Sequence, residues 1–341
     1  MYRKWVKLSL LFVFLVIIAG AMVRMTGSGM GCPDWPKCFG YYIPPTEASE
    51  LEWQPNKFFK KGQVIIKDRT LQVAEDSFTT SDRFDTANWS TYTKHDYATF
   101  NVWHTWIEYV NRLFGALSGL AILIMAVFSL KEWKQDRRIT ILSWLGVILI
   151  VFQAWLGATV VYSVLSPVKI TIHMVMALVI VALLLYLLFI SKKERKNYNV
   201  SQGYRGILLI ALVCSLLQIV LGTQVRQHVD DQVRLLGYEN KSLWLTDSTV
   251  TFYIHRSFSI LVVMLNISVW YFNRVYRYGL KFLNIMMLLV IAEIITGISM
   301  YYFDFPMLTQ PLHLIFASLL FAIQFYVVLQ AYQQRNEWKS S

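Results

Sequence analysis

The chain has 341 residues, of which 56% are hydrophobic and 16% are charged, whereas a soluble domain has roughly 45–50% apolar and about 25% charged residues. These proportions exclude a disordered chain, a disulfide scaffold and a coiled coil, and they argue against a water-soluble enzyme. The formal net charge of +11 comes from Lys and Arg clusters between apolar runs, without an aromatic-interleaved basic stripe. We therefore expect no nucleic-acid partner.

The long uncharged runs predict transmembrane helices, because a helix needs roughly 20 apolar residues to cross a bilayer. The first run has a basic flank but lacks a small-x-small cleavage site, so we expect a retained span rather than a signal peptide. The fold class is thus predicted to be an all-α polytopic membrane protein with eight spans. The expected spans cover residues 5–24, 102–130, 139–162, 168–190, 205–226, 250–272, 280–302 and 309–332.

The basic residues divide the connections between spans into two sides. Clusters such as 131–138 and 192–196 alternate with connections that carry few Lys or Arg residues. The positive-inside rule then predicts that both termini lie in the cytoplasm. The loop 25–101 is the one long hydrophilic segment, and this topology places it outside.

Two cysteines lie at the start of the long outer loop. Exposed cysteines in an oxidising compartment tend to pair, and the Pro and Gly residues near Cys32 and Cys38 favour a turn that brings them together. We expect a Cys32–Cys38 disulfide, with two free or redox-active thiols as the alternative. Cys214, inside an expected span, is predicted to be an inert apolar residue.

The two halves of the membrane part resemble one another. Each half has a Gly-x-x-Val-Arg end to its first span, a Tyr-x-x-Arg block in its second, and a glycine 16 residues before a histidine. The matched segments are 20–24 with 222–226, 108–112 with 252–256, and 157–173 with 297–313. Four spans return the chain to its starting side, so the copies run parallel about an axis along the membrane normal. We predict two four-helix bundles, residues 1–200 and 201–341, each with one possible site.

Histidines near the outer ends of the spans indicate a haem site in the second half. His255 and His313 each lie about five residues, or roughly 7 Å, below a span end. A hydrogen-bonded interfacial imidazole is the alternative for either alone, but polar residues inside spans are costly and usually functional. Two imidazoles facing each other across a bundle suit a six-coordinate haem iron. Arg256 is expected to pair with a propionate, and snorkelling to headgroups is its alternative.

The first half departs from this pattern. It keeps His173, but Asn111 stands where the second half has a histidine, and Glu108 lies one turn away on the same helix face. Arg112 is expected to pair with a propionate. An iron that lacks a strong second ligand beside a carboxylate suits proton transfer or stabilisation of developing positive charge. We expect the second half to hold a haem permanently and the first half to modify one.

Two further polar residues carry alternatives. Glu293 and Gln153 each precede a glycine by four residues; a neutral, hydrogen-bonded packing role is expected for Glu293, with a proton route as the alternative. His104 is expected to lie at the interface rather than to bind iron.

These residues resemble the haem A synthase family. The matching elements are residues 23–29, residues 32–40, the Glu-Tyr-x-x-Arg block at 108–112, the Tyr-x-His-Arg block at 253–256, and the histidines at 173 and 313. The resemblance covers the eight spans in order and fails for most of residues 45–98. The family pattern usually has a histidine where this chain has Asn111, which indicates a five-coordinate iron on His173 or a lineage variant with different substrate handling.

The resemblance implies an enzyme of the bacterial cytoplasmic (inner) membrane that oxidises the C8 methyl of haem O to the formyl group of haem A. In family terms, His255 and His313 ligate a resident haem b, and Glu108 is the essential carboxylate. The implied partners are the haem O farnesyltransferase, a quinol or other electron donor, and the cytochrome oxidase assembly machinery; association with further copies stays open.

The alternatives are a non-enzymatic b-type cytochrome that carries electrons and an oxidase assembly factor without chemistry. Glu108 and Asn111 argue against the cytochrome, which would need four histidines and no catalytic carboxylate. A transporter is disfavoured because the polar layer lies near one surface rather than at the midplane.

Overall fold

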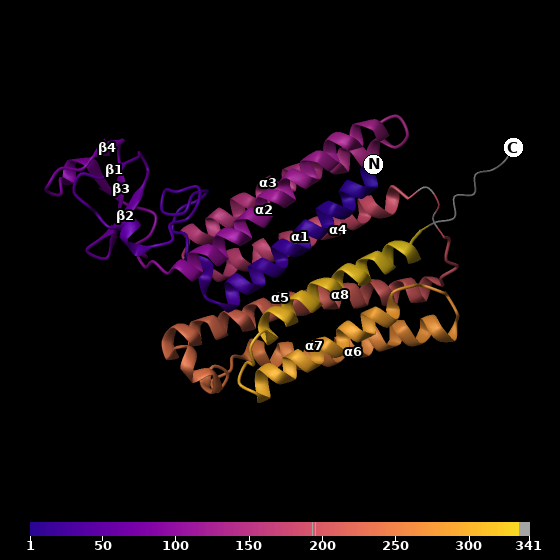
Figure 1. Ribbon diagram of the computed structural model, residues 1–341. Coiled ribbons are helices and arrows are strands. Elements are labelled where there is room, and N and C mark those ends of the chain that lie inside the picture. The colour runs from indigo at the N-terminus through magenta and orange to yellow at the C-terminus, as the bar shows by residue number, and fades with distance from the viewer. Residues whose placement is uncertain (193, 195, 334–341) are drawn as a thin grey trace. The chain divides into compact units, whose positions relative to one another are not determined.

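The computed structural model describes residues 1–192, 194 and 196–333 (Figure 1). Within these residues, eight helices are long and apolar enough to cross a membrane, which confirms the predicted all-α polytopic fold class. They are α1 (Tyr2–Met25), α2 (Val102–Ser129), α3 (Arg137–Tyr162), α4 (Pro167–Ile190), α5 (Gln202–Leu236), α6 (Val250–Val275), α7 (Leu283–Tyr302) and α8 (Thr309–Ala331). Short 3₁₀ helices are η1 (Ser28–Met30), η2 (Ala48–Leu51), η3 (Thr86–Asn88), η4 (Leu130–Glu132) and η5 (Tyr238–Leu243).

The end of α5 is the one helix boundary where the prediction is clearly wrong. We expected the span to end at residue 226, but the helix continues to Leu236. Charged residues extend it, since Arg226 and Asp230 form an i,i+4 ion pair at 2.8 Å. Gly237, at φ 80°, then ends the helix. Apolar runs mark where a helix lies in lipid, and a polar continuation of the same helix leaves no hydropathy signal.

The chain forms two compact units, each described here by itself. The bundle unit comprises residues 1–11, 121–149 and 174–341, and the loop unit comprises residues 12–120 and 150–173. The division into two parallel repeats stays a prediction.

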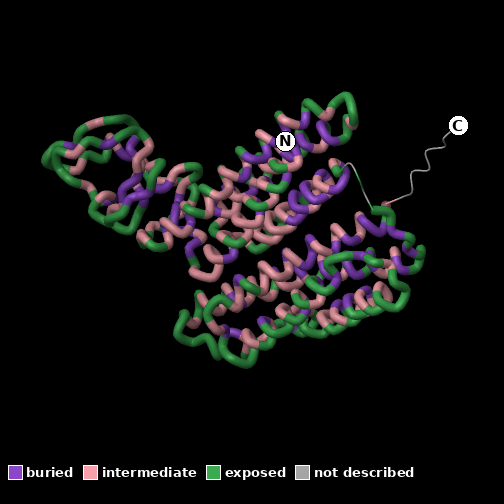
Figure 2. Tube along the Cα trace, turned by 45° about the vertical axis from the view of Figure 1, so that its right-hand side comes forward, coloured by how far each residue is buried: buried purple, intermediate pink, exposed green. Residues whose placement is uncertain are grey.

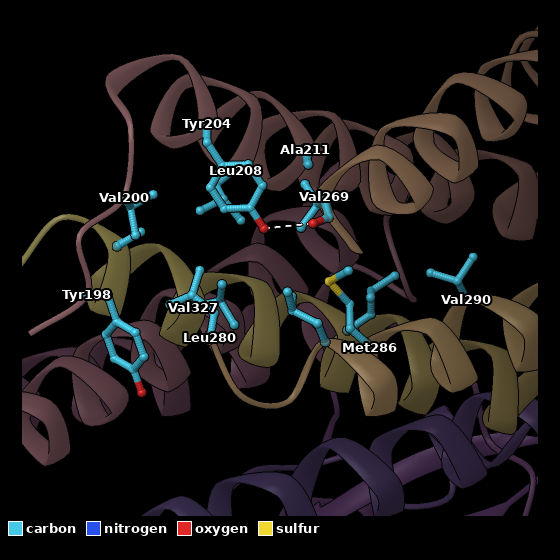
Figure 3. Packing of buried hydrophobic residues seen from close by; sticks show 13 residues of the cluster. Tyr198, Val200, Tyr204, Leu208, Ala211, Val269, Leu280, Met286, Val290 and Val327 are labelled. Carbon is cyan, nitrogen blue, oxygen red and sulfur yellow. Dashed lines mark hydrogen bonds between the residues drawn. The ribbon is translucent and has the colours of Figure 1, made fainter. Parts of the chain in front are cut away.

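Helices α5 to α8 pack together within the bundle unit. α5 contacts α6 and α8, and α7 contacts α6 and α8. A buried apolar cluster lies between them, in which the Tyr204 hydroxyl on α5 donates a hydrogen bond of 2.7 Å to the Val269 carbonyl on α6 (Figure 3). Because lipid tails are as apolar as leucine, such close packing and interhelical hydrogen bonds hold membrane bundles together.

A buried polar network also joins three of these helices. The Gln324 side chain of α8 donates to Ser215 Oγ of α5 at 2.9 Å and to Asn266 Oδ1 of α6 at 2.7 Å. Large apolar side chains such as Ile260 and Leu288 are exposed. Figure 2 shows exposed positions, in green, recurring along the helices. An apolar exposed face around an interior with interhelical hydrogen bonds is typical of helices surrounded by lipid.

The outer loop folds into two small antiparallel sheets inside the loop unit. β1 (Phe58–Phe59) pairs with β4 (Phe78–Thr79), and a second sheet has the order β2 (Val64–Lys67), β3 (Thr70–Ala74), β5 (Trp89–Thr91). The β2–β3 hairpin turns through Asp68 and Arg69, both at positive φ, as a two-residue hairpin turn requires. The buried rings of Phe59 and Trp89 pack edge to face with centroids 5.1 Å apart. The sequence analysis expected a loop here and did not predict these strands.

Candidate functional site

His255 lies near the start of α6 and packs into a space that a glycine leaves on α5. A Cβ added to Gly222 would stand 3.1 Å from Cε1 of the His255 ring. One turn earlier, Gln218 donates from Nε2 to the backbone carbonyl of His255 at 3.0 Å, and the same nitrogen lies 3.5 Å from the ring Nε2. The imidazole is thus held between two helices rather than pointing into lipid.

His313 lies near the start of α8 in the matching position against α7. A Cβ on Gly297 would stand 3.6 Å from its Cε1. Nδ1 of His313 lies 2.9 Å from Glu293 Oε2 and 2.8 Å from Thr296 Oγ1. The Thr296 hydroxyl donates to the Ala292 carbonyl at 2.8 Å, so it accepts from Nδ1. A proton on Nδ1 of His313 satisfies both oxygens, and the neutral imidazole with that proton has its lone pair on Nε2.

The two imidazoles of the bundle unit form a donor set that suits an iron porphyrin. His255 and His313 each lie within the first two turns of their helix, α6 and α8. Nδ1 of His255 is buried and has no hydrogen-bond partner, and a buried unsatisfied nitrogen in a native site calls for a missing partner. Neutral imidazole nitrogen is an axial ligand of haem iron. The residues present fit the predicted haem b site.

His173 on α4 repeats the His255 arrangement inside the loop unit. A Cβ on Gly157 of α3 would stand 3.3 Å from Cε1 of His173. Gln153, four residues before Gly157, donates to the His173 carbonyl at 3.0 Å, and its Nε2 lies 3.5 Å from the ring Nε2. Nδ1 of His173 is buried without a partner. This imidazole is also presented from between two helices.

Asn111 occupies the corresponding place between α1 and α2. A Cβ on Gly20 would stand 3.8 Å from Asn111 Oδ1, and this oxygen is buried without a hydrogen-bond partner. Four residues before Gly20 stands Val16, where the other three helix pairs have glutamine or glutamate. The helix pair α1 and α2 therefore keeps the glycine, but it lacks the histidine and the glutamine or glutamate found in the other three helix pairs.

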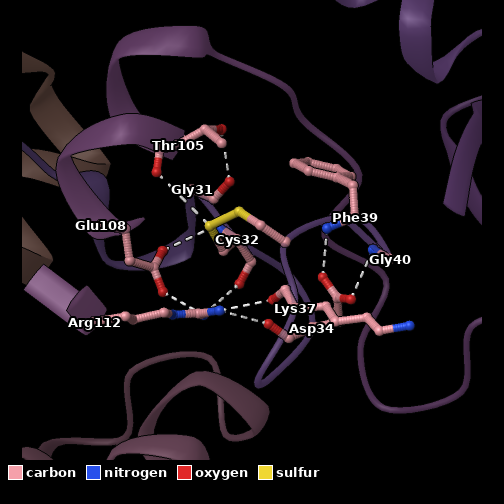
Figure 4. The surroundings of a disulfide bond; sticks show 10 residues. Gly31, Cys32, Asp34, Lys37, Phe39, Gly40, Thr105, Glu108 and Arg112 are labelled. Carbon is pink, nitrogen blue, oxygen red and sulfur yellow. Dashed lines mark hydrogen bonds and ion pairs between the residues drawn. A yellow bond between two sulfur atoms is a disulfide. The ribbon is translucent and has the colours of Figure 1, made fainter. Parts of the chain in front are cut away.

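Glu108, one turn from Asn111 on α2, is 4% exposed and holds the start of the outer loop. Its Oε2 accepts a hydrogen bond of 2.9 Å from the backbone N–H of Cys32. Its Oε1 lies 2.6 Å from Arg112 Nη2, an i,i+4 ion pair between two largely buried side chains (Figure 4). Glu108 therefore links the helix to the cysteine loop.

Arg112 is committed to the same loop. Its Nη1 donates to the carbonyls of Asp34 and Lys37, both at 2.8 Å, and its Nη2 donates to the Cys32 carbonyl at 3.1 Å as well as to Glu108 (Figure 4). All four hydrogen atoms on the terminal nitrogens are thus used within the protein. The pairing of Arg112 with a propionate stays a prediction. Its hydrogen bonds hold the backbone of residues 32–37 against α2, and we call this arrangement the clamp.

The loop beneath this clamp is closed by a disulfide. Cys32 and Cys38 are bonded, with Cα atoms 4.7 Å apart, in the pairing that the sequence favoured. The Asp34 carboxylate accepts from the backbone N–H groups of Phe39 and Gly40. Burial raises the pKa of Asp34 above its ordinary value, while these two hydrogen bonds and the Arg112 charge oppose the rise. Cys214 is unpaired, as predicted.

Arg256 is exposed and His104 is half-buried. The guanidinium of Arg256 stands over the Tyr301 ring, 5.5 Å from its centroid. The backbone carbonyl of His104 faces Gly31, where an added Cβ would lie less than 2.5 Å away. The bond from Thr105 Oγ1 to the Gly31 carbonyl, 2.7 Å long, fixes the loop at that close approach. The interfacial role expected for His104 stays a prediction.

Similarity to known proteins supports a common origin for this arrangement. The family model COX15-CtaA, described as cytochrome oxidase assembly protein, matches residues 3–325. The chain belongs to the COX15-CtaA family. Three relatives are named "Heme A synthase". The protein from Alkalihalophilus pseudofirmus is 26% identical over 330 residues, 93% of either chain. That from Shouchella clausii is 26% identical, covering 93% of this chain and 92% of its own. That from Wolbachia sp. subsp. Brugia malayi is 24% identical with the same coverage.

In this COX15-CtaA member, sequence reasoning missed Gln218 and Thr296 and named Gln153 without predicting its contact with a histidine. Gln218 and Gln153 hold the backbones of His255 and His173, and Thr296 accepts from His313. A usable signal exists for the two glutamines, because each precedes a helix glycine by four residues, as Glu293 does. Thr296 has no counterpart in the other helix pairs and could be recognised only from the structure.

Proposed function

We propose that this chain is a haem A synthase, which oxidises the C8 methyl of haem O to the formyl group of haem A. The observation that carries the proposal is the similarity to proteins named "Heme A synthase" across 93% of the chain. The presentation of three imidazoles from between helices supports it, because haem ligands in helical bundles come from facing helices.

The bundle unit would bind a resident haem b through His255 and His313. The unpartnered Nδ1 of His255 and the two oxygens that hold Nδ1 of His313 support this assignment. Such a haem supplies one-electron transfer when bound. Arg256 is the cation that we assign to a propionate, since its guanidinium is exposed beside the site with a ring contact to Tyr301.

The loop unit would bind the substrate, haem O, through His173. Oxidation of the methyl group to the formyl group adds one oxygen atom and, written with water, releases four protons and four electrons. We assign Glu108 to accept protons or to stabilise positive charge at the reacting carbon. Asn111, one turn from Glu108 on the same face, would donate a hydrogen bond to a water or ligand on the substrate iron, which its amide can do and a histidine ligand would prevent.

The remaining parts of the proposal follow from the charge pattern and the chemistry. The protein would lie in the bacterial inner membrane with both termini in the cytoplasm, so that the disulfide loop faces the oxidising side. Haem O would come from its farnesyltransferase, electrons from a quinol or another donor, and the product would pass to the cytochrome oxidase assembly machinery.

The experiment is to purify the full-length protein after co-expression with a haem O farnesyltransferase and to identify the extracted haems by mass. The wild type is expected to contain haem A. Glu108→Ala and Glu108→Gln are expected to lose haem A while keeping the low-spin spectrum of the resident haem, which reports that the protein is folded. Glu132→Ala, at the opposite end of the same span, is the matched control and keeps haem A.

Recovery of haem b alone from the wild type would contradict the proposal and favour the electron-carrying cytochrome. Haem A at the wild-type level in both Glu108 variants would remove the catalytic assignment of Glu108.

A further inference from the structure

The three histidines of the two units differ in the polar group that faces them. Gln153, Gln218 and Glu293 occupy equivalent positions, four residues before a glycine that contacts the ring. Of these three, only Glu293 is an acid. The two ligands proposed for the resident haem therefore have unequal surroundings, with an amide beside His255 and a carboxylate beside His313.

The contacts differ in kind as well as in charge. Gln218 donates to the backbone carbonyl of His255 at 3.0 Å and leaves the ring Nδ1 without a partner. Glu293 Oε2 lies 2.9 Å from Nδ1 of His313, and Thr296 Oγ1 lies 2.8 Å from the same atom. Both oxygens accept from this one N–H, because the Thr296 hydroxyl is already used as a donor to the main chain.

Two acceptors on Nδ1 have a definite consequence for the other ring nitrogen. They fix the tautomer in which Nε2 carries the lone pair, and they hold the ring plane in place between α7 and α8. A carboxylate acceptor also draws the proton away from the ring and makes Nε2 a stronger donor to a metal. A stronger axial donor stabilises the oxidised iron, which bears the higher charge, and lowers the reduction potential.

We propose that Glu293 is a positioning residue that, with Thr296, orients His313 and lowers the midpoint potential of the resident haem. This inference rests on the proposed function, in which His255 and His313 bind that haem. This role differs from the neutral packing role that we expected for Glu293 from the sequence. Its carboxylate accepts a hydrogen bond from His313, a proposed haem ligand, rather than from the helix backbone. A low potential makes the haem a better reductant toward the substrate site.

The test is a potentiometric titration of the resident haem in the purified full-length protein, followed by its absorption and its low-spin electron paramagnetic resonance. Glu293→Gln keeps the size of the side chain and is expected to shift the midpoint potential upward, with altered g-values and an intact bis-imidazole signal. Thr296→Val removes the weaker, uncharged acceptor and is expected to shift the potential upward by less. Gln153→Ala, at the equivalent position in the loop unit, is the matched control and leaves the resident haem unchanged.

An unchanged midpoint potential in Glu293→Gln with haem bound overturns the inference. If Glu293→Gln loses the haem, Thr296→Val decides in its place, and an unchanged potential there overturns the inference equally. A wild-type protein without a low-spin haem would instead contradict the proposed function, so the two failures are distinguishable.

Discussion

Replacing Gly222 with alanine places a methyl group against the ring of His255, whereas the same replacement at Gly297 leaves His313 undisturbed. The added Cβ would stand 3.1 Å from His255 Cε1 but 3.6 Å from His313 Cε1. Carbon atoms in favourable contact are about 3.5–4.0 Å apart. The first substitution therefore forces a displacement of a few tenths of an ångström, and the second reaches ordinary contact.

The expected energies follow from these distances. A ring forced off its preferred rotamer costs about 0.5–1.5 kcal/mol, and replacing a helical glycine by alanine gains up to about 1 kcal/mol. The two effects nearly cancel for Gly222→Ala, so its thermal stability should stay close to that of the wild type. Gly297→Ala has the gain without the strain and should be more stable by up to about 1 kcal/mol.

The assay combines thermal unfolding in detergent with the low-spin spectrum of the resident haem. Gly222→Ala is expected to change the g-values or to reduce the haem content, and Gly297→Ala to leave both unchanged. A spectrum that Gly297→Ala alters as much as Gly222→Ala would refute the reasoning.

The loop unit offers a second matched pair, in which Gly157→Ala is expected to disturb substrate-haem binding more than Gly20→Ala, because their added Cβ atoms stand 3.3 Å and 3.8 Å from the facing side chains.

Three further predictions concern the loop unit. Asn111→His supplies an imidazole opposite a glycine and is expected to shift the second haem toward low spin; an unchanged spectrum would show that residue 111 does not face the iron. Arg112→Gln breaks a buried ion pair and its bonds to the loop, which costs about 3–5 kcal/mol, so alkylation of Cys38 should proceed at a lower reductant concentration than in the wild type. Burial raises the pKa of Asp34 above 3.8, so its contribution to stability is full below that pH and is lost as the pH rises through the raised pKa. Asp34→Asn should make the thermal stability of the loop unit depend less on pH between 3.8 and the raised pKa of Asp34. A dependence on pH equal to that of the wild type would contradict the assignment of this titration to Asp34.

The positions of the membrane helices could be predicted from the sequence because an apolar run of roughly 20 residues is long enough to cross a bilayer as a helix. The end of α5 could not, since Arg226 and Asp230 stabilise the helix by pairing with each other but lower the mean hydropathy, so that the apolar run ends before the helix does. The strands within residues 58–91 were also missed. They are short and are held by the aromatic contacts of Phe59 and Trp89, which depend on tertiary packing.

The candidate site was predictable to the extent that it repeats. The equal spacing from Gly157 to His173 and from Gly297 to His313 identified the histidines that pack against glycines. The partners of Arg112 have no such signal, because they are backbone carbonyls whose position depends on the path of the loop. The sequence does not distinguish an arginine that donates to backbone carbonyls from one that binds a ligand.

The most direct test of this account is the electron paramagnetic resonance spectrum of the purified full-length protein and of three single variants. His255→Ala and His313→Ala are each expected to lose the low-spin bis-imidazole signal of the resident haem. His104→Ala, which removes a half-buried imidazole of α2 that is not assigned to the haem, is expected to retain it. A bis-imidazole signal that persists unchanged in both His255→Ala and His313→Ala would contradict the assignment of the haem to the bundle of α5 to α8.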